Sequence, residues 1–302
     1  MKILHINDQA GVACILAKFQ EKQGVKSKVI AIADKYGIKD YYKNNVILVE
    51  KENFYTACLN EAASYDIVHL HSVDALVYKL RRKYGKKKKI ILHYHGTDLR
   101  GNYKKSITLE LRLKRFGVRI KNKLWLLRNG YTGSLQGTMQ HQADIVLVST
   151  PDLLKFANNS CYLPNPVDTE LFNESTSILN KDYKYDAITI KTEAIDIQKA
   201  LNYIKDRNIS HNIFILDRAH SPTQYKDMPD LLKKYNTYID IKFVNGKLLE
   251  SSSKTALESL ACGLEVLNYQ LKYTKKLPDK HEPLNVVKNL FNIYLSSKDS
   301  VK

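Results

Sequence analysis

The sequence predicts an α/β fold in which two doubly wound domains follow one another along the chain. Short, almost fully apolar strands alternate with amphipathic helices through both halves of the sequence. Such strands form parallel sheets that helices cover on both faces. The 302 residues also exceed the usual size of one domain, so we expect two domains of about 150 residues each.

The first domain is predicted to span residues 1–165. We expect the strands of its sheet at residues 2–6, 28–33, 46–50, 66–71, 89–95 and 143–149. Helical patterns occur between and after them, at residues 12–24, 54–64, 75–85 and 151–157. Ligands bind such sheets beyond the carboxyl ends of the strands, so the loops that follow the strands are where functional residues should lie.

The second domain is predicted to span residues 166–282, and a closing helix follows at 283–302. A bend at Pro164 and Pro166 and a polar stretch from Asn173 to Lys184 mark the boundary between the domains. We expect strands at residues 186–191, 212–216, 238–243 and 264–269, and helices at 194–207, 228–235 and 253–262. This pattern indicates a second, smaller sheet of the same kind.

The positive charge of the chain is concentrated in one segment. Between Lys79 and Gly130 there are 18 basic side chains against two acidic ones, which leaves +16 of the total net charge of +17. Such a block suits an anionic partner: a nucleic acid, a phosphorylated substrate or an acidic membrane. The sequence has no helix-turn-helix, zinc-finger or aromatic RNA-binding signature, so we do not expect a nucleic-acid partner.

Residues 104–128 have the pattern of a helix that lies on a membrane surface. One apolar stripe suits packing on the domain, and Leu111, Val118 and Trp125 form a second apolar ridge opposite it. Basic side chains lie on both sides of this ridge. We therefore predict that five residues bind an anionic membrane: Arg112, Arg115, Arg119, Lys123 and Trp125. The alternative is that the second ridge packs inside the first domain or against another subunit.

The rest of the composition indicates a cytoplasmic protein, which would be peripheral on the inner face of the membrane. No apolar run reaches the ~18 residues of a membrane span, and the N-terminus reads as a strand rather than a secretory signal. The four cysteines are scattered without C-x-x-C spacing, so we expect free thiols and no metal site. They are Cys14, Cys58, Cys161 and Cys262.

Two loops after predicted strands of the first domain have candidate ligand-binding residues. The loop "NDQAG" ends in Gly11 ahead of a helix, and "HYHGTDLRG" places His95 and Asp98 just past a strand. A single glycine is too sparse for a dinucleotide-binding G-x-G-x-x-G loop, and taken alone it fits an ordinary turn. A histidine at a strand end can likewise be structural or can contact a ligand.

A third candidate is the stretch "KLLESSSKTALESLACGLEVLNY", which sets Glu250 and Glu258 eight positions apart around a helix start. Capping residues predict that the helix begins near residue 253, and its first amides would form an anion site that Lys254 strengthens. The alternative is that Thr255 and Glu258 form a capping box while Glu250 is a solvated loop residue.

The order of these motifs resembles the glycosyltransferase family 4 enzymes, which have the GT-B fold. The motifs are the Gly-containing loop after the first strand, "HGTD", "ADIVLVSTPDLL", "YLPNPVDTELF", and E-x(7)-E followed by "SLACGLEVL". The resemblance covers nearly the whole chain. It implies two Rossmann-like domains facing a cleft, with an acceptor held by the first domain. It also implies a nucleotide-sugar donor held by the second domain as a co-substrate, retention of anomeric configuration, and neither a cofactor nor an essential metal.

The resemblance also implies roles for individual residues. Glu258 matches the glutamate that binds the donor ribose, and Glu250 matches the one beside the donor sugar. The amides of Ser253, Lys254 and Thr255 match the loop that holds the distal phosphate. Gly11 matches the loop of the first domain that approaches the phosphate and the acceptor, and His95 matches the histidine that lines the transferred sugar. His95 and Glu250 are therefore the candidate catalytic residues.

The sequence departs from the family pattern where a Gly-Arg pair usually neutralises the diphosphate. We expect Lys191, at the end of the matching strand, to replace that arginine, with Arg218 and Lys254 as further candidates. The loop before Glu258 also lacks the usual Gly-Phe-Gly. The leading hypothesis is thus a retaining hexosyltransferase that acts on a glycan or a lipid-linked acceptor. The alternatives are a nucleotide-sugar epimerase on a similar scaffold and a catalytically inactive basic binding protein.

Overall fold

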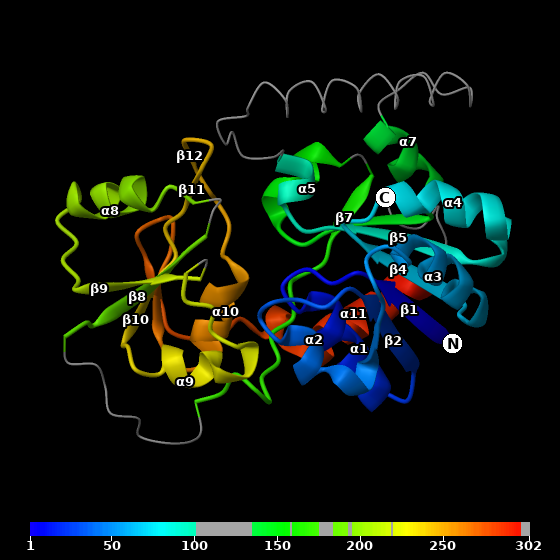
Figure 1. The fold of residues 1–302 in the computed structure, drawn as a ribbon. Coiled ribbons are helices and arrows are strands. Elements are labelled where there is room, and N and C mark those ends of the chain that lie inside the picture. Colours follow the sequence, from blue (N-terminus) through cyan, green and yellow to red (C-terminus); the bar gives the residue numbers. More distant parts are fainter. Residues whose placement is uncertain (101–134, 158, 175–183, 193–194, 219, 297–302) are drawn as a thin grey trace.

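The computed structural model contains two α/β domains that lie side by side (Figure 1). The doubly wound fold predicted from the sequence is confirmed. In the described part of the chain, no helix is long and apolar enough to cross a membrane. The structure describes residues 1–100, 135–157, 159–174, 184–192, 195–218 and 220–296.

The first, N-terminal domain (the N-domain) contains a parallel sheet in the order β3-β2-β1-β4-β5-β6-β7. Its central strands are almost completely buried, because helices cover both faces and apolar side chains point to each. Its strands are β1 (Lys2–Ile6), β2 (Lys26–Ala31), β3 (Val46–Leu48), β4 (Ile67–His71), β5 (Lys89–Tyr94), β6 (Ile145–Val148) and β7 (Ser160–Tyr162). The strand order reverses between β1 and β4, where a doubly wound sheet opens a crevice for a ligand.

Several helices of the N-domain differ in length or type from the sequence prediction. The segment Pro151–Phe156 is a short 3-10 helix rather than an α-helix, since only Leu153 of its apolar residues is buried. Strand β7 was not predicted, because its three half-buried residues carry no apolar pattern. The described α-helices are α1 (Val12–Lys22), α2 (Ile38–Tyr41), α3 (Phe54–Glu61), α4 (Ala75–Tyr84), α5 (Thr97–Arg100) and α7 (Leu135–Gln142).

The second, C-terminal domain (the C-domain) has a smaller sheet in the order β14-β13-β10-β8-β9. In this sheet only β14 runs antiparallel to its neighbour. The order reverses between β8 and β10, so the loops after these two strands flank the corresponding crevice. The strands are β8 (Ala187–Lys191), β9 (Ile213–Asp217), β10 (Thr237–Ile239), β13 (Glu265–Leu267) and β14 (Tyr273–Thr274). The described helices are α8 (Ile197–Lys205), α9 (Met228–Leu232) and α10 (Lys254–Ala261).

The predicted strand at 238–243 is wrong in its second half. The chain leaves the sheet after Ile239, and a small hairpin follows, made of β11 (Phe243–Val244) and β12 (Lys247–Leu248). Its turn is Asn245-Gly246, and both residues have left-handed φ values of 52° and 76°. An Asn-Gly pair favours this backbone, so the hairpin had a local signal that the apolar pattern obscured.

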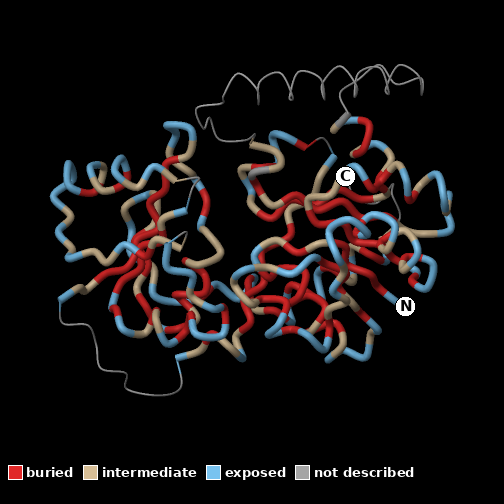
Figure 2. Tube along the Cα trace, viewed as in Figure 1, coloured by how far each residue is buried: buried red, intermediate tan, exposed pale blue. Residues whose placement is uncertain are grey.

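Helix α11 (Pro283–Leu295) returns from the C-domain and lies beside α1 of the N-domain (Figure 1). The Tyr294 hydroxyl is 2.7 Å from Nδ1 of His69. The ammonium of Lys89 donates to the carbonyl of Ser296 at 2.6 Å. Buried side chains of both domains form one continuous apolar cluster. Figure 2 shows buried residues in red in the interior of both domains. The closing helix therefore fastens the two domains together.

Candidate active site between the domains

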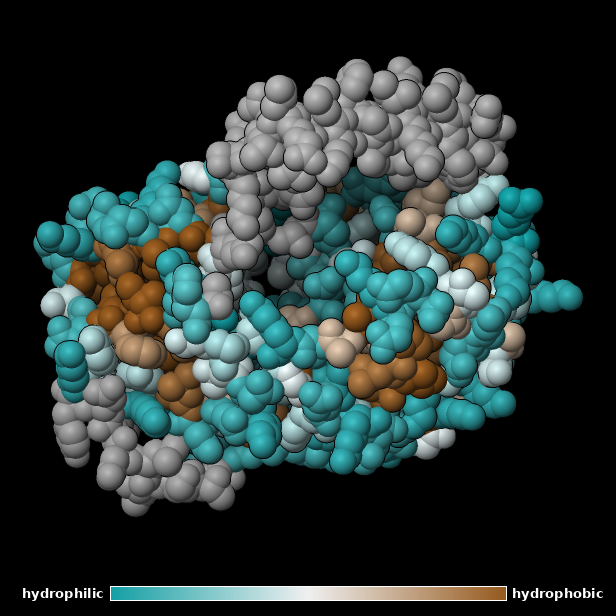
Figure 3. Space-filling model, in the orientation of Figure 1, coloured by the Kyte–Doolittle hydropathy of each residue, from teal (hydrophilic) through white to brown (hydrophobic). Residues whose placement is uncertain are grey.

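Among the described residues, two cavities lie between the domains, and Glu250 lines both of them. The larger has a volume of about 610 Å³ and is lined by Arg100 and Asp152 of the N-domain and by residues of the β11–β12 hairpin. Ser149 and Thr150 line the second, together with Ser252 of the C-domain. Figure 3 shows a hollow between the domains with many hydrophilic side chains around it. The structure thus places Glu250 in an interdomain cleft.

Helix α10 begins where the sequence predicts, and Ser253 is its N-cap. The hydroxyl of Ser253 accepts a hydrogen bond from the amide of Ala256 at 3.2 Å. The predicted alternative of a Thr255–Glu258 capping box is therefore wrong, because the helix starts two residues too early for it. The amide and hydroxyl of Ser253 donate to the Asp240 carboxylate at 2.9 and 2.6 Å. The first helical amides, those of Lys254 and Thr255, have no acceptor within the helix.

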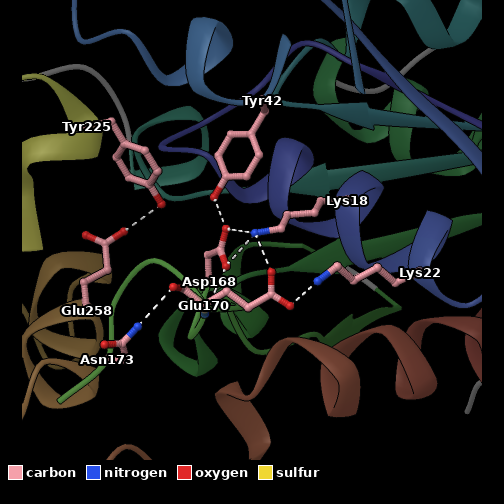
Figure 4. Close-up of polar contacts among 8 residues, drawn as sticks. All are labelled: Lys18, Lys22, Tyr42, Asp168, Glu170, Asn173, Tyr225 and Glu258. Carbon is pink, nitrogen blue, oxygen red and sulfur yellow. Dashed lines mark hydrogen bonds and ion pairs between the residues drawn. The ribbon is translucent and has the colours of Figure 1, made fainter. Parts of the chain in front are cut away.

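Glu258 is buried at the domain interface and already has two partners. Its carboxylate pairs with the Lys254 ammonium at 2.5 Å. It also accepts from the Tyr225 hydroxyl at 3.4 Å, a contact that Figure 4 shows. Burial raises the pKa of Tyr225 well above its usual value, so the phenol remains a donor. The ammonium of Lys254 is thus in an ion pair with Glu258 in this structure. Both partners contact the same oxygen of the Glu258 carboxylate, Oε1.

The Gly11 loop of the N-domain meets the same part of the C-domain. Gly11 precedes α1 with a left-handed φ of 81°, and a methyl group added there would lie 3.6 Å from the Tyr225 hydroxyl. The amide of Tyr225 donates to the carbonyl of Tyr36 at 2.8 Å. Tyr225 therefore brings Gly11 and Glu258 together, and the sequence carried no signal for this role.

The two basic residues proposed for the diphosphate differ in their surroundings. Lys191 is half-exposed, and its ammonium pairs with the Asp217 carboxylate at 2.8 Å. Arg218 follows β9, and its guanidinium lies over the Tyr36 ring at 3.9 Å. The Nε and Nη2 atoms of Arg218 are buried and have no hydrogen-bond partner among the described residues. Because a buried unpaired guanidinium is unfavourable, Arg218 is the better candidate to hold an anion.

His95 lies just past β5 in a loop that Asp98 holds in place. The Asp98 carboxylate accepts from the amides of His95, Gly96 and Leu99 at 3.0, 2.7 and 3.0 Å, and from the Ser72 hydroxyl at 2.5 Å. Burial lowers the pKa of His95 to about 4, against the opposite effect of Asp98, so the ring is neutral near pH 7. Its Nε2 lies 2.9 Å from Nδ1 of His71.

Asp168 fixes the linker between the domains onto the N-domain. Its fully buried carboxylate accepts from the Lys18 ammonium at 2.7 and 3.0 Å and from the Tyr42 hydroxyl at 2.7 Å (Figure 4). Lys18 also pairs with Glu170 at 3.1 Å. The "NPVDTE" stretch of the linker is thus an anchor, which positions the C-domain loops over the Gly11 loop.

The residues predicted to bind a membrane, Arg112, Arg115, Arg119, Lys123 and Trp125, lie outside the described residues. The sequence did not identify Tyr225 and Asp168 as residues of the domain interface, nor Asp240 as the partner of Ser253 at the start of α10. Asp240 had a signal, since it is a single carboxylate inside an apolar run and is 2 % exposed in the structure. For Tyr225 the sequence offered none.

Comparisons with known proteins show the class of fold. No family model matches the sequence, and no curated protein matches it. Among solved structures, the chain is similar to a sucrose-phosphate synthase from Thermosynechococcus elongatus, with 10% identity, a TM-score of 0.52, and coverage of 100% of this chain and 93% of that one. It is also similar to an α-glucosyltransferase in complex with UDP and DNA, with 13% identity, a TM-score of 0.53, and coverage of 98% and 90%. The fold is therefore GT-B, as predicted.

Proposed function

We propose that this protein is a retaining glycosyltransferase of the family 4 type, which moves a sugar from a nucleotide-sugar donor to an acceptor. The observation that carries the proposal is Arg218, whose guanidinium is held against Tyr36 while two buried nitrogens have no partner among the described residues. A diphosphate at the domain interface would satisfy these nitrogens with charge-assisted hydrogen bonds. The α-glucosyltransferase with a similar fold was determined with UDP, which supports a nucleotide ligand.

The proposed donor site assigns a role to each group around the interface. Arg218 and the amides of Lys254 and Thr255 bind the diphosphate, because fixed donors aimed at a leaving diphosphate stabilise its developing charge. Glu258 binds the ribose through its carboxylate, whose Oε1 contacts Tyr225 and Lys254 in this structure. Glu250 lines the cleft cavities and, with His95, would contact the donor sugar. Lys191, paired with Asp217, is the secondary candidate for the diphosphate.

The proposed acceptor is a glycan or a lipid-linked molecule at an anionic membrane surface, and the protein would be cytoplasmic and peripheral there. The support is the sequence pattern of residues 104–128, in which seven cations flank two apolar ridges. Each cation near an anionic leaflet contributes about 1 kcal/mol of binding free energy, so the segment suffices without a membrane span.

The test is to incubate the purified protein with a panel of nucleotide-sugars and to measure nucleoside diphosphate release and the configuration of the sugar. We expect slow hydrolysis of at least one donor, with release of its nucleoside diphosphate and retention at the anomeric carbon. Epimerisation of the sugar without release of the nucleotide would replace the proposal by the epimerase alternative. If nucleotide-sugars bind but the protein turns over none of them, the result would support the alternative of a catalytically inactive binding protein.

A further inference from the structure

Five of the nine histidines lie on one face of the N-domain sheet, at the carboxyl ends of its three central strands. They are His5 on β1, His69 and His71 on β4, His93 on β5 and His95 just beyond it. The strand register sets His5 beside His69 and His71 beside His93. The first four are fully buried, and only His95 reaches the edge of the cluster as a half-buried side chain.

The five rings form two hydrogen-bonded chains, each anchored on a helix that covers the sheet. In the first, Gln20 of α1 contacts His5, His5 contacts His71, and His71 contacts His95, at 2.9, 3.0 and 2.9 Å. In the second, Tyr294 of α11 contacts His69, and His69 contacts His93, at 2.7 and 3.2 Å. The second chain ends at Nε2 of His93, which is buried and has no hydrogen-bond partner in the described part of the protein.

An unpartnered nitrogen at this depth is unfavourable, because it has lost its water without gaining a partner. His93 lies beside the outer ends of the first chain: its ring centre is 4.2 Å from that of His95 and 5.3 Å from that of His71. One ring nitrogen from each of His71, His93 and His95 lies within 4.8 Å of one from each of the other two.

We propose that His71, His93 and His95 bind a divalent transition-metal ion, with Zn²⁺ the first candidate. Three neutral imidazoles are a ligand set that suits zinc, and they leave a fourth position for water or another ligand. The ligand atoms would be Nδ1 of His71 and Nε2 of His93 and His95. This site departs from the sequence-based expectation of no metal, which rested on the scattered cysteines and on the family resemblance.

The hydrogen bonds around the cluster fit this choice of ligand atoms. Metal-bound histidines donate their second ring N–H to an acceptor, which fixes the ring and its tautomer. With a metal on Nδ1 of His71, its Nε2–H donates to His5, and Nε2–H of His5 donates to the Gln20 oxygen. With a metal on Nε2 of His93, its Nδ1–H donates to His69, and Nδ1–H of His69 donates to the Tyr294 oxygen. Both chains therefore end correctly in an acceptor.

The neighbouring triad of His5, His69 and His71 is a poorer site, although its nitrogens are similarly close. Both nitrogens of each of these three rings already have hydrogen-bond partners, so a metal there would break at least two of these bonds. In the outer triad a metal would replace one bond, that between His71 and His95, and would use the unpartnered Nε2 of His93. Access also favours the outer triad, because His95 lies half-buried at the open edge of the cluster.

Cobalt binding tests the proposal without any sugar donor, so its outcome is independent of the proposed transfer reaction. The full-length chain, without a histidine tag and freed of metal by a chelator, is titrated with Co²⁺, whose visible absorption reports its ligands. We expect one Co²⁺ per chain and displacement by Zn²⁺. His93→Ala and His95→Ala should each weaken binding by more than the about 10- to 100-fold typical of losing an outer hydrogen-bond partner.

The control variant is His220→Ala, since His220 is exposed on the C-domain, and it should bind Co²⁺ as the wild type does. Melting curves show which variants are folded, and if His93→Ala fails to fold, His95→Ala decides the question. Absence of Co²⁺ binding by the wild-type chain overturns the proposal. Binding that is unchanged in the folded His93 and His95 variants overturns it as well.

Discussion

The guanidinium of Arg218 lies 3.9 Å from the centre of the Tyr36 ring, so a cation of the C-domain rests on an aromatic side chain of the N-domain. The ring holds the charged group without occupying its N–H donors. Two of the guanidinium nitrogens consequently remain buried and without partners among the described residues. An anion at this interface would be bound by both domains, and this makes Arg218 the basis of the proposed donor site.

Glu258→Gln should weaken the binding of a nucleoside diphosphate by about tenfold or more, because the ribose hydroxyls would lose a charged acceptor. The affinity of the Glu258→Gln variant for inorganic pyrophosphate, which has no ribose, should not fall. Tyr225→Phe is the companion variant: it removes the phenol that occupies the Glu258 carboxylate, so nucleotide affinity should rise. Calorimetric titrations with both ligands measure these effects. An equal loss for nucleotide and pyrophosphate in Glu258→Gln would contradict the ribose role.

His95→Ala should reduce turnover at saturating donor while changing the dissociation constant of the donor little. The reason is that His95 belongs to the N-domain and is proposed to contact the sugar rather than the nucleotide. Steady-state rates combined with direct binding measurements separate the two effects. Unchanged turnover in a folded His95→Ala variant would show that this residue is structural.

Asp168→Asn should lower the free energy of unfolding by about 3 kcal/mol, since one partner of a buried ion pair loses its charge. Lys18 keeps its contact with Glu170, which limits the loss. Urea denaturation gives the measurement, as a lower midpoint with an unchanged slope. The control is Lys22→Gln, whose more exposed pair with Glu170 should contribute less than about 1 kcal/mol. Similar midpoints for the two variants would argue against an anchoring role for Asp168.

Replacing Arg112, Arg115, Arg119 and Lys123 together by glutamine should abolish most binding to anionic vesicles. Co-sedimentation of the wild-type protein should require anionic lipid and weaken as salt is added, because the attraction is electrostatic. The melting temperature should stay unchanged if these side chains serve the membrane rather than the fold. Equal binding to neutral vesicles, or none to either kind, is incompatible with the proposed membrane surface.

Local patterns predicted much of the fold and the start of α10. Apolar strands between helices predicted both sheets, since a strand buried on two faces must be apolar throughout. Ser253 and Gly263 predicted the ends of α10, because the one can cap the first amides and the other adopts a left-handed φ of 83°. These signals are local, so they need no knowledge of the tertiary structure.

The histidine cluster and the Tyr225 contact could not be predicted in the same way. The H-x-H pairs at 69 and 71 and at 93 and 95 do indicate a shared face within each strand. Only the pairing of β4 with β1 and β5, however, brings the five rings together. Tyr225 reaches Gly11 and Glu258 because the domains close on one another, and that arrangement depends on the Asp168 anchor and on α11.

The central claim is that a nucleoside diphosphate binds between the domains on Arg218. Its most direct test is calorimetric titration of the wild-type protein, Arg218→Ala and Arg207→Ala with UDP, GDP and dTDP. Arg207 is the matched control, since its guanidinium also stacks on a tyrosine, Tyr203, but at the exposed end of α8. The account predicts that at least one nucleotide binds the wild type and Arg207→Ala alike and binds Arg218→Ala at least about tenfold more weakly. Absence of binding by all three nucleotides, or equal affinity in Arg218→Ala, would contradict it.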